Sequence, residues 1–389
     1  MEVSRSLLSS SMRRGLLSAL RARVHRGHKP GIDSPASGMS TATAGLDDQA
    51  DALQAELNRL TAALQVVQRQ RSPMLWNELE GLVPDSLGTI TEAVRAVSAD
   101  DGDFSKALEF AIERFSGCVQ GPLLAAIDPE QLRALVAADL LPVPPPEARE
   151  WYFEGDDMSY WTSGLGDRLL LEDLGRQLGR PLTIDSRLLD FGSSSGRVLR
   201  HFANAIPQMP AIGVDLGSRS VEWVRQHLHP AVTVVHGTTL PHLPFPDGYF
   251  DCIYAGSVFT HIADFEEAWL IELSRVLAPR GFAVLTFHPE RTWTEMGSNP
   301  EHWVRQLIDR GPHRLDPGAI EPVGVEVFQS PMPAERVVLT LANAPVNSAN
   351  VFHSHTWIRE RWARFFDVQL ILARAHADYQ DAAVLTRSP

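Results

Sequence analysis

The stretch LLDFGSSSGR, residues 188–197, places an acidic side chain just before a run of small residues bracketed by two glycines. An apolar run that contains Asp190 is typical of a buried strand, and the small residues after it predict a turn into a helix. Such a turn presents backbone N–H groups at the carboxyl edge of a sheet, where the ligands of doubly wound sheets bind. Larger side chains would hold a ligand away, so Gly192 and Gly196 indicate that a ligand comes close to the peptide groups.

The glycine spacing disfavours two of the ligands that use a loop of this form. A phosphate-binding loop needs a Lys-Ser/Thr pair after its last glycine, and none follows Gly196. A dinucleotide fingerprint needs glycines at its first, third and sixth positions, where this chain has Gly192, Ser194 and Arg197. Neither a triphosphate site nor a nicotinamide site is therefore the preferred interpretation.

A second acid, Asp215, ends the strand-like run AIGVD, 25 residues after Asp190. A carboxylate at that place can accept two hydrogen bonds from the hydroxyls of a ribose. Dinucleotide-binding folds carry an acid at a similar position. Asp215 thus predicts a ribose but does not choose the cofactor.

The elements that must position these residues alternate along the chain. Strand-like runs occur at 187–191, 211–215, 232–235, 250–255 and 281–287. Helical patterns occur before the first of them at 163–178 and between them at 196–205, 218–228 and 264–277. This alternation predicts an α/β fold with a doubly wound, mostly parallel sheet. Two last strand-like runs, 367–375 and 381–387, are too close for a helical crossover, so we expect a seven-stranded sheet that ends in an antiparallel hairpin.

From about residue 185 to 290 the chain resembles the class I S-adenosylmethionine-dependent methyltransferases. The glycine-bracketed loop is similar to theirs, except that Ser194 stands where that family usually has a third glycine. The stretch from HGTTLPHL to LSRVLAPRGFAVL, residues 236–285, carries the most specific part of the likeness. The resemblance implies S-adenosyl-L-methionine as the cofactor. It assigns to the cofactor site Asp190, Gly192, Ser193, Ser194, Gly196, Asp215, Leu216, Thr238, Thr239, Gly256 and Ser257.

Methyl transfer to a hydroxyl also requires the removal of a proton, and an imidazole with a near-neutral pKa suits that role. We take His261 and His288 as the candidate catalytic bases, because both follow strands and should lie on the cofactor's side of the sheet. His353 and His355 are further candidates. A structural role is the alternative for each of these histidines. No spacing of His, Cys, Asp and Glu indicates a metal site.

Aromatic residues gather just before the first strand, in the order Trp151, Tyr152, Tyr160 and Trp161. An aromatic face stabilises a sulfonium ion by cation–π attraction, so one of these rings could cover the cofactor. Packing in the core is the alternative for such a cluster.

The residues before 148 show hardly any of this resemblance. Residues 1–45 hold seven Lys/Arg against two acids and predict a disordered basic tail and linker, with a transit peptide in 1–30 as the alternative. Residues 46–72 repeat apolar positions at 4-3 spacing, which predicts a coiled-coil-like helix that joins two copies or packs on the protein's own core. Residues 73–147 predict a helical region that ends in PVPPPE, and 148–389 the methyltransferase domain.

The composition of the 389 residues limits the classes of partner that we expect. A net charge of −13 argues against nucleic acid, and no apolar run is long enough to span a bilayer. Two cysteines are too few for a disulfide framework, and we expect a cytoplasmic protein, or an organellar one if the transit peptide is real.

Together these features predict a methyltransferase that moves a methyl group to a hydroxyl, or an amine, of a small molecule or sugar. The long segment 291–350 should cover the active site and select the acceptor. Two alternatives stay open. One is a non-catalytic scaffold that keeps the fold and acts through its coiled coil, and the other is an NAD-dependent oxidoreductase.

Overall fold

The computed structural model divides into two compact units, residues 1–83 and 84–389. It describes residues 88–92, 109, 112–149, 152–153, 155–309, 313–315, 322–341 and 349–387, all of which belong to the second unit. The predicted basic tail (1–45) and coiled-coil-like helix (46–72) lie outside the described residues, as does Trp151. The domain boundaries at 45, 72 and 147 stay predictions.

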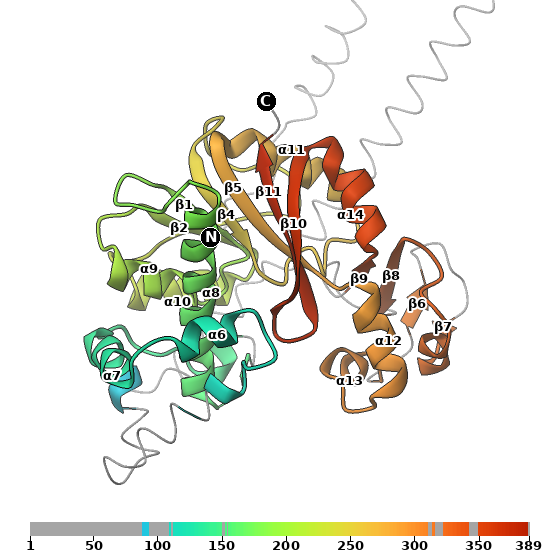
Figure 1. Cartoon of the computed structure of the whole chain (residues 1–389), viewed down its shortest axis with the longest axis horizontal. Coiled ribbons are helices and arrows are strands. Elements are labelled where there is room, and N and C mark those ends of the chain that lie inside the picture. The colour runs from blue at the N-terminus through green and yellow to red at the C-terminus, as the bar shows by residue number, and fades with distance from the viewer. Residues whose placement is uncertain are drawn as a thin grey trace, which may run out of the picture. The chain divides into compact units, whose positions relative to one another are not determined.

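A seven-stranded sheet forms the centre of the described unit, with strand order β10-β11-β5-β4-β1-β2-β3 (Figure 1). Its strands are β1 (Leu188–Phe191), β2 (Ala211–Asp215), β3 (Thr233–His236), β4 (Phe250–Ala255), β5 (Leu277–Phe287), β10 (Phe366–His376) and β11 (Gln380–Arg387). Strands β1 to β5 are parallel, whereas β11 pairs antiparallel with both β5 and β10. The predicted fold class and the closing hairpin are confirmed.

Helices cover both faces of the sheet, and adjacent residues of β1 show why. Leu188 belongs to the core under one set of helices and Leu189 to the core under the other, because successive strand residues point to opposite faces. The first face is covered by α8 (Asp157–Gln177), α9 (Leu199–Ala205) and α10 (Ser218–His227). The second face is covered by α11 (Glu266–Val276), α14 (His355–Arg361) and the short η4 (Trp362–Arg364).

A small helical layer precedes the sheet. It consists of α6 (Gln120–Ala125), α7 (Pro129–Ala138) and η1 (Pro146–Arg149). Helix α7 starts where a proline occupies its first turn and the Asp128 side chain accepts the amide of Glu130 at 2.8 Å. The buried residues of this layer share a core with Tyr160, Trp161 and Leu165 of α8. The layer therefore packs on the helix that leads into β1.

A second, four-stranded sheet lies in the segment between β5 and α14, and the sequence pattern did not predict it. The segment consists of α12 (Glu290–Ser298), α13 (Trp303–Asp309), β6 (His313–Leu315), β7 (Pro322–Val323), η2 (Val325–Gln329), β8 (Arg336–Leu341) and β9 (Asn350–His353), and we call it the insertion. Its strand order is β7-β6-β8-β9, and its core is aromatic around Trp293, Phe328 and Phe352.

Glu266, in the first turn of α11, connects the insertion to the helices that cover the second face of the central sheet. One carboxylate oxygen accepts the indole N–H groups of Trp357 at 3.0 Å and Trp362 at 2.7 Å. The other pairs with Arg336 of β8 and meets His353 Nε2 at 3.1 Å. Burial would raise the pKa of Glu266, but its partners His353 and Arg336 outweigh burial and lower that pKa. An ionised, fully paired carboxylate thus joins α11 to four further elements: α14, η4, β8 and β9.

Candidate functional site

The predicted site residues gather at one edge of the sheet. Asp190 and Asp215 lie at the carboxyl ends of β1 and β2, Gly256 and Ser257 directly follow β4, and His288 directly follows β5. Because these strands are parallel, their carboxyl ends share an edge. We call the loops after β1, β2 and β3 the cofactor side, and His261, the loop after β5 and the insertion the acceptor side. Gly256 and Ser257, which directly follow β4, lie between the two.

The loop after β1 is shaped by left-handed backbone at Gly192 (φ 85°), Ser194 (φ 45°) and Gly196 (φ 82°). Ser194 takes a conformation that costs an ordinary residue roughly 1–2 kcal/mol, which explains why glycine suits this position. A Cβ on Gly192 would collide with Val258, and one on Gly196 would lie 2.9 Å from Leu228 Cδ1. The glycines are therefore required by neighbouring side chains as well as by backbone shape, a reason that differs from the predicted approach of a ligand.

Asp215 joins the loops after β1 and β2. Its carboxylate accepts the amide of Ser194 at 2.7 Å and the amide of Gly217 at 2.6 Å, one bond on each oxygen. Burial raises the pKa of Asp215, and the bonds from Gly217 and Ser194 oppose that rise. Each carboxylate oxygen can accept a second hydrogen bond, so the geometry leaves capacity for ribose hydroxyls.

Asp190 lies beneath these loops and is only 3% exposed. Burial raises its pKa to about 7, with Arg197 lowering it and the charges of Asp167 and Asp215 raising it. Asp190 is therefore affected by the charges of two further acids, Asp167 and Asp215, and of one arginine, Arg197. Such a site favours a ligand that carries positive charge.

Other predicted residues of the cofactor side differ in exposure. Leu216 is 44% exposed, and Leu240 beyond β3, which was not among the predicted residues, is 47% exposed. Thr238 and Thr239 are exposed between them. Ser193 is buried, and its hydroxyl has no hydrogen-bond partner within the described part of the chain.

Sequence reasoning missed the face of α8 that packs on the loop after β1. Arg197 Nη2 meets Asp167 Oδ2 at 2.7 Å, and Arg197 Nη1 donates to Ser163 Oγ at 3.1 Å. Tyr160 OH lies 2.9 Å from Ser195 Oγ, and a Cβ on Gly164 would collide with the Arg197 carbonyl. These α8 residues follow i, i+3, i+4, i+7 spacing, which is the signal that could have identified one packed helical face.

The aromatic residues expected near the cofactor lie in two different environments. Trp161 is 1% exposed and donates its indole N–H to Asp139 at 2.7 Å, and Tyr160 is buried against Ser195, so both belong to the core. Tyr152 instead faces the Arg197 guanidinium at 5.3 Å, with its hydroxyl 2.9 Å from His376 Nε2. Tyr152 therefore contacts Arg197, a charged residue of the loop after β1.

His261 is held by the insertion. Its Nδ1 lies 2.8 Å from the carbonyl oxygen of Ala349, and the amide of Val351 donates to the Thr260 carbonyl at 2.8 Å. Because a carbonyl oxygen only accepts, Nδ1 carries the proton and Nε2 keeps its basic lone pair. Burial lowers the pKa of His261, which keeps the ring neutral at pH 7.

His288 lies between two aromatic rings, with ring centroids 5.1 Å from Phe352 and 5.8 Å from Tyr379. It is 2% exposed, and its Nδ1 has no hydrogen-bond partner among the described residues. Burial, and then the nearby His261, lower its pKa well below the ordinary value. His353 and His355, the further candidates, pair instead with Glu266 and Asp381.

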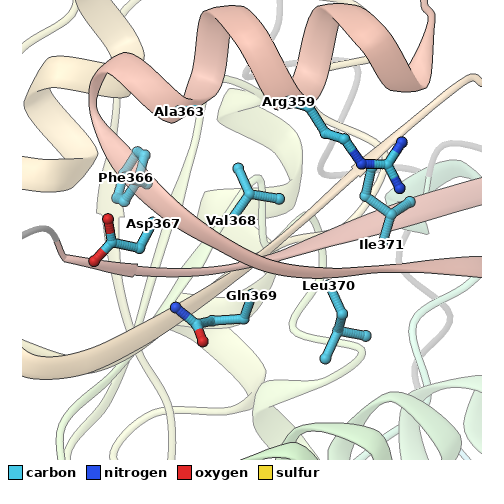
Figure 2. A pocket seen from close by; sticks show the side chains of 8 residues that line it. All are labelled: Arg359, Ala363, Phe366, Asp367, Val368, Gln369, Leu370 and Ile371. Carbon is cyan, nitrogen blue, oxygen red and sulfur yellow. The ribbon is translucent and has the colours of Figure 1, made fainter.

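A groove of about 390 Å³ lies elsewhere, along the edge strand β10 (Figure 2). It is lined by Arg359, Ala363, Phe366, Asp367, Val368, Gln369, Leu370 and Ile371. None of the predicted site residues lines it. Within the described ranges, no helix is both long and apolar enough to cross a membrane.

Comparisons with known proteins fall on this same region. A family model of the methyltransferase domain matches residues 189–285. An uncharacterized protein from a Streptomyces fradiae transposon is 34% identical over 139 residues, 33% of this chain and 38% of that protein. The demethylmenaquinone methyltransferase of Thermus thermophilus is 34% identical over 107 residues, 26% of this chain and 48% of that enzyme. The chain thus spans less than half the length of these relatives.

A solved structure of a Pyrococcus horikoshii protein has a TM-score of 0.37 and 15% identity, over 57% of this chain and 90% of that one. Similarity at that level assigns nothing by itself. The family match, however, runs from β1 into β5 and contains Asp190, the glycine-bracketed loop and Asp215. The chain therefore carries a class I S-adenosylmethionine-dependent methyltransferase-like domain.

Proposed function

We propose that the protein is an S-adenosylmethionine-dependent methyltransferase that transfers a methyl group to a hydroxyl, or an amine, of a small molecule or sugar. The observation that carries this proposal is Asp215. Its carboxylate sits at the end of β2, joined to the glycine-bracketed loop through Ser194, with further acceptor capacity on both oxygens.

The residues of the cofactor side suit the cofactor in charge and polarity. Asp215 would hold the ribose, and the exposed Leu216 would offer apolar surface to the adenine beside Thr238 and Thr239. The acids Asp167, Asp190 and Asp215 outnumber Arg197 at this edge and would favour the positive sulfonium. When bound, the cofactor supplies a methyl group that is already activated for in-line displacement.

The chain's own contribution to the chemistry would come mainly from the acceptor side. His261 Nε2 would take the proton that the acceptor hydroxyl loses as its oxygen bonds to the methyl carbon. The electron pair of the broken carbon–sulfur bond stays on sulfur, so charge and atoms balance. His288, neutral and with no partner for Nδ1 among the described residues, would contact the acceptor. The insertion would select that acceptor, because its Ala349 carbonyl orients His261.

Calorimetry with S-adenosylmethionine, S-adenosylhomocysteine and NAD tests the proposal. We expect both sulfur compounds to bind and NAD not to bind. Incubation of candidate acceptors with enzyme and cofactor should then add the mass of one methylene unit to one of them. Binding of neither sulfur compound would favour the scaffold alternative, and tight NAD binding the oxidoreductase.

Self-association through residues 46–72 is a separate proposal that rests on the 4-3 spacing of apolar residues there. Light scattering should show a smaller assembly for a protein that lacks residues 1–73 than for the full chain. Equal numbers of copies in both would contradict it.

A further inference from the structure

A closed ring of three hydrogen bonds holds the loop after β4. The Ser257 amide donates to Thr286 Oγ1 at 2.7 Å, and the Thr286 hydroxyl donates to Gln380 Oε1 at 2.7 Å. Gln380 Nε2 completes the ring by donating to Ser257 Oγ at 2.9 Å. Thr286 and Gln380 are each 1% exposed and Ser257 is partly buried, so the Thr286–Gln380 bond is shielded from water and the bonds of the ring strengthen one another.

The ring holds a backbone conformation that Ser257 would not adopt by preference. Ser257 has a φ of 59°, in the left-handed region that disfavours residues with a side chain. The next residue, Val258, occupies the space beside Gly192 on the cofactor side. The turn at Gly256 and Ser257 is thus fixed from β5 and β11 on one side and contacts the glycine-bracketed loop on the other.

We propose that Gln380 is a positioning residue for the cofactor: through Ser257 it sets the conformation of the loop after β4, and thereby the affinity of the site for S-adenosylmethionine. This inference rests on the proposed function. It gives a role to the antiparallel hairpin, since Gln380 is the first residue of β11 and acts on a loop 123 residues earlier in the chain.

Three substitutions distinguish an effect of the ring on cofactor affinity from a general loss of stability. Gln380→Leu removes both of its hydrogen bonds in the ring at similar volume. Gln380→Glu preserves them, because a carboxylate can accept the Thr286 and Ser257 hydroxyls and a carboxylic acid can still donate to Ser257. Within the ring, Ser257→Ala removes only the bond from Gln380 Nε2, because the amide of residue 257 can still donate to Thr286. The matched control is Gln369→Leu, since Gln369 of the same hairpin donates to Thr386 Oγ1 at 2.9 Å, away from the loop.

We expect Gln380→Leu and Ser257→Ala to weaken S-adenosylmethionine binding about tenfold in calorimetry, since one to two buried hydrogen bonds are lost. Gln380→Glu should stay within about threefold of wild type, and Gln369→Leu should bind as wild type does. Hydrogen exchange of the full, ligand-free chain should show faster exchange of residues 256–261 in Gln380→Leu but not in Gln369→Leu.

Wild-type affinity in a folded Gln380→Leu protein, or an equal loss in Gln369→Leu, would overturn the inference. If Gln380→Leu does not fold, wild-type affinity in Ser257→Ala would overturn it as well. If the wild type itself does not bind S-adenosylmethionine, the proposed function and the effect on affinity both fall. Exchange in residues 256–261 then decides whether Gln380 positions the loop.

Discussion

The two sides of the site differ in how far apart in the chain their contacts originate. On the cofactor side, Asp215 bonds to Ser194, 21 residues away, and to Gly217, two residues away. On the acceptor side, His261 is oriented by a carbonyl 88 residues away. Ser257, between the two sides, is held by a side chain 123 residues away. The contacts of the cofactor side join residues that are close in the chain, whereas those of the acceptor side join distant segments.

The two sides also differ in how completely their polar atoms are paired. Both Asp215 oxygens are bonded, whereas His288 Nδ1, His302 Nε2 and His353 Nδ1 are buried without a partner within the described ranges. Each unpaired buried group costs roughly 1–3 kcal/mol unless a ligand or water satisfies it. Ser193 Oγ shows that the cofactor side has such an atom too. The comparison suggests a preformed site for one constant cofactor beside a site that its acceptor completes.

The largest effect is expected from His261→Ala, which tests whether chemistry belongs to the acceptor side. Loss of a general base lowers kcat by about a thousandfold, and the affinity for S-adenosylmethionine should not change. Initial rates with a saturating acceptor, together with calorimetry, measure the two effects. His242→Ala is the control, because its side chain is 78% exposed. A parallel loss of cofactor affinity would place His261 on the cofactor side.

Asp167→Ala tests whether α8 supports the cofactor side. Burial opposes ionisation of Asp167, but Arg197 and His376 outweigh it and lower the pKa of the carboxyl. Removing it leaves Arg197 buried without that partner, so the free energy of unfolding should fall by about 3–5 kcal/mol in denaturant titrations. Asp173→Ala is the matched control on α8, since Asp173 is partly exposed where it pairs with Arg176. Equal losses in both proteins would contradict the support by α8.

The same division explains what could be predicted from the sequence. Apolar runs such as LLDF form strands that are buried on both faces, so strand positions and the antiparallel hairpin follow from local composition. The positions of Asp190 and Asp215 could be predicted as well, because each lies at the end of a strand, just before a short turn. These features depend only on residues that are close together in the chain.

The acceptor side could not be predicted in this way. Strands β6 and β7 are two or three residues long, and Arg336 of β8 is held by Glu266, 70 residues earlier. Nothing near His261 in the sequence specifies that Ala349 orients it. Sequence patterns report periodicity within an element, whereas these contacts depend on how separate elements meet.

Asp215→Ala tests whether the cofactor side depends on its local carboxylate. The variant removes the acceptor for two backbone amides and for the ribose hydroxyls, so affinity for S-adenosylmethionine should fall about a hundredfold. Calorimetry measures this fall. Asp251→Ala is the matched control, because Asp251 accepts the Arg187 amide at 2.9 Å at the opposite edge of the sheet. Undiminished affinity in Asp215→Ala would show that this carboxylate does not bind the ribose, and it would contradict the proposed function.

The smallest effect concerns pH and the charge of the cofactor side. The pKa of Asp190 is raised to about 7, chiefly by burial, so this carboxyl is protonated below that pH and ionised above it. The folded protein binds this proton more tightly than the unfolded chain, so its contribution to stability falls as pH rises toward 7. Ligand binding runs the other way, because the ionised carboxylate attracts the sulfonium.

From pH 8 to pH 6, affinity for S-adenosylmethionine should therefore fall about tenfold as Asp190 takes up its proton. S-adenosylhomocysteine lacks the sulfonium charge and should lose less, and Asp190→Asn should remove the difference between the two compounds. Calorimetry of both ligands at the two pH values supplies the comparison. Equal slopes for both ligands in the wild type would mean that Asp190 does not sense the charge lost in the reaction, and the cofactor side would then distinguish cofactor from product by shape alone.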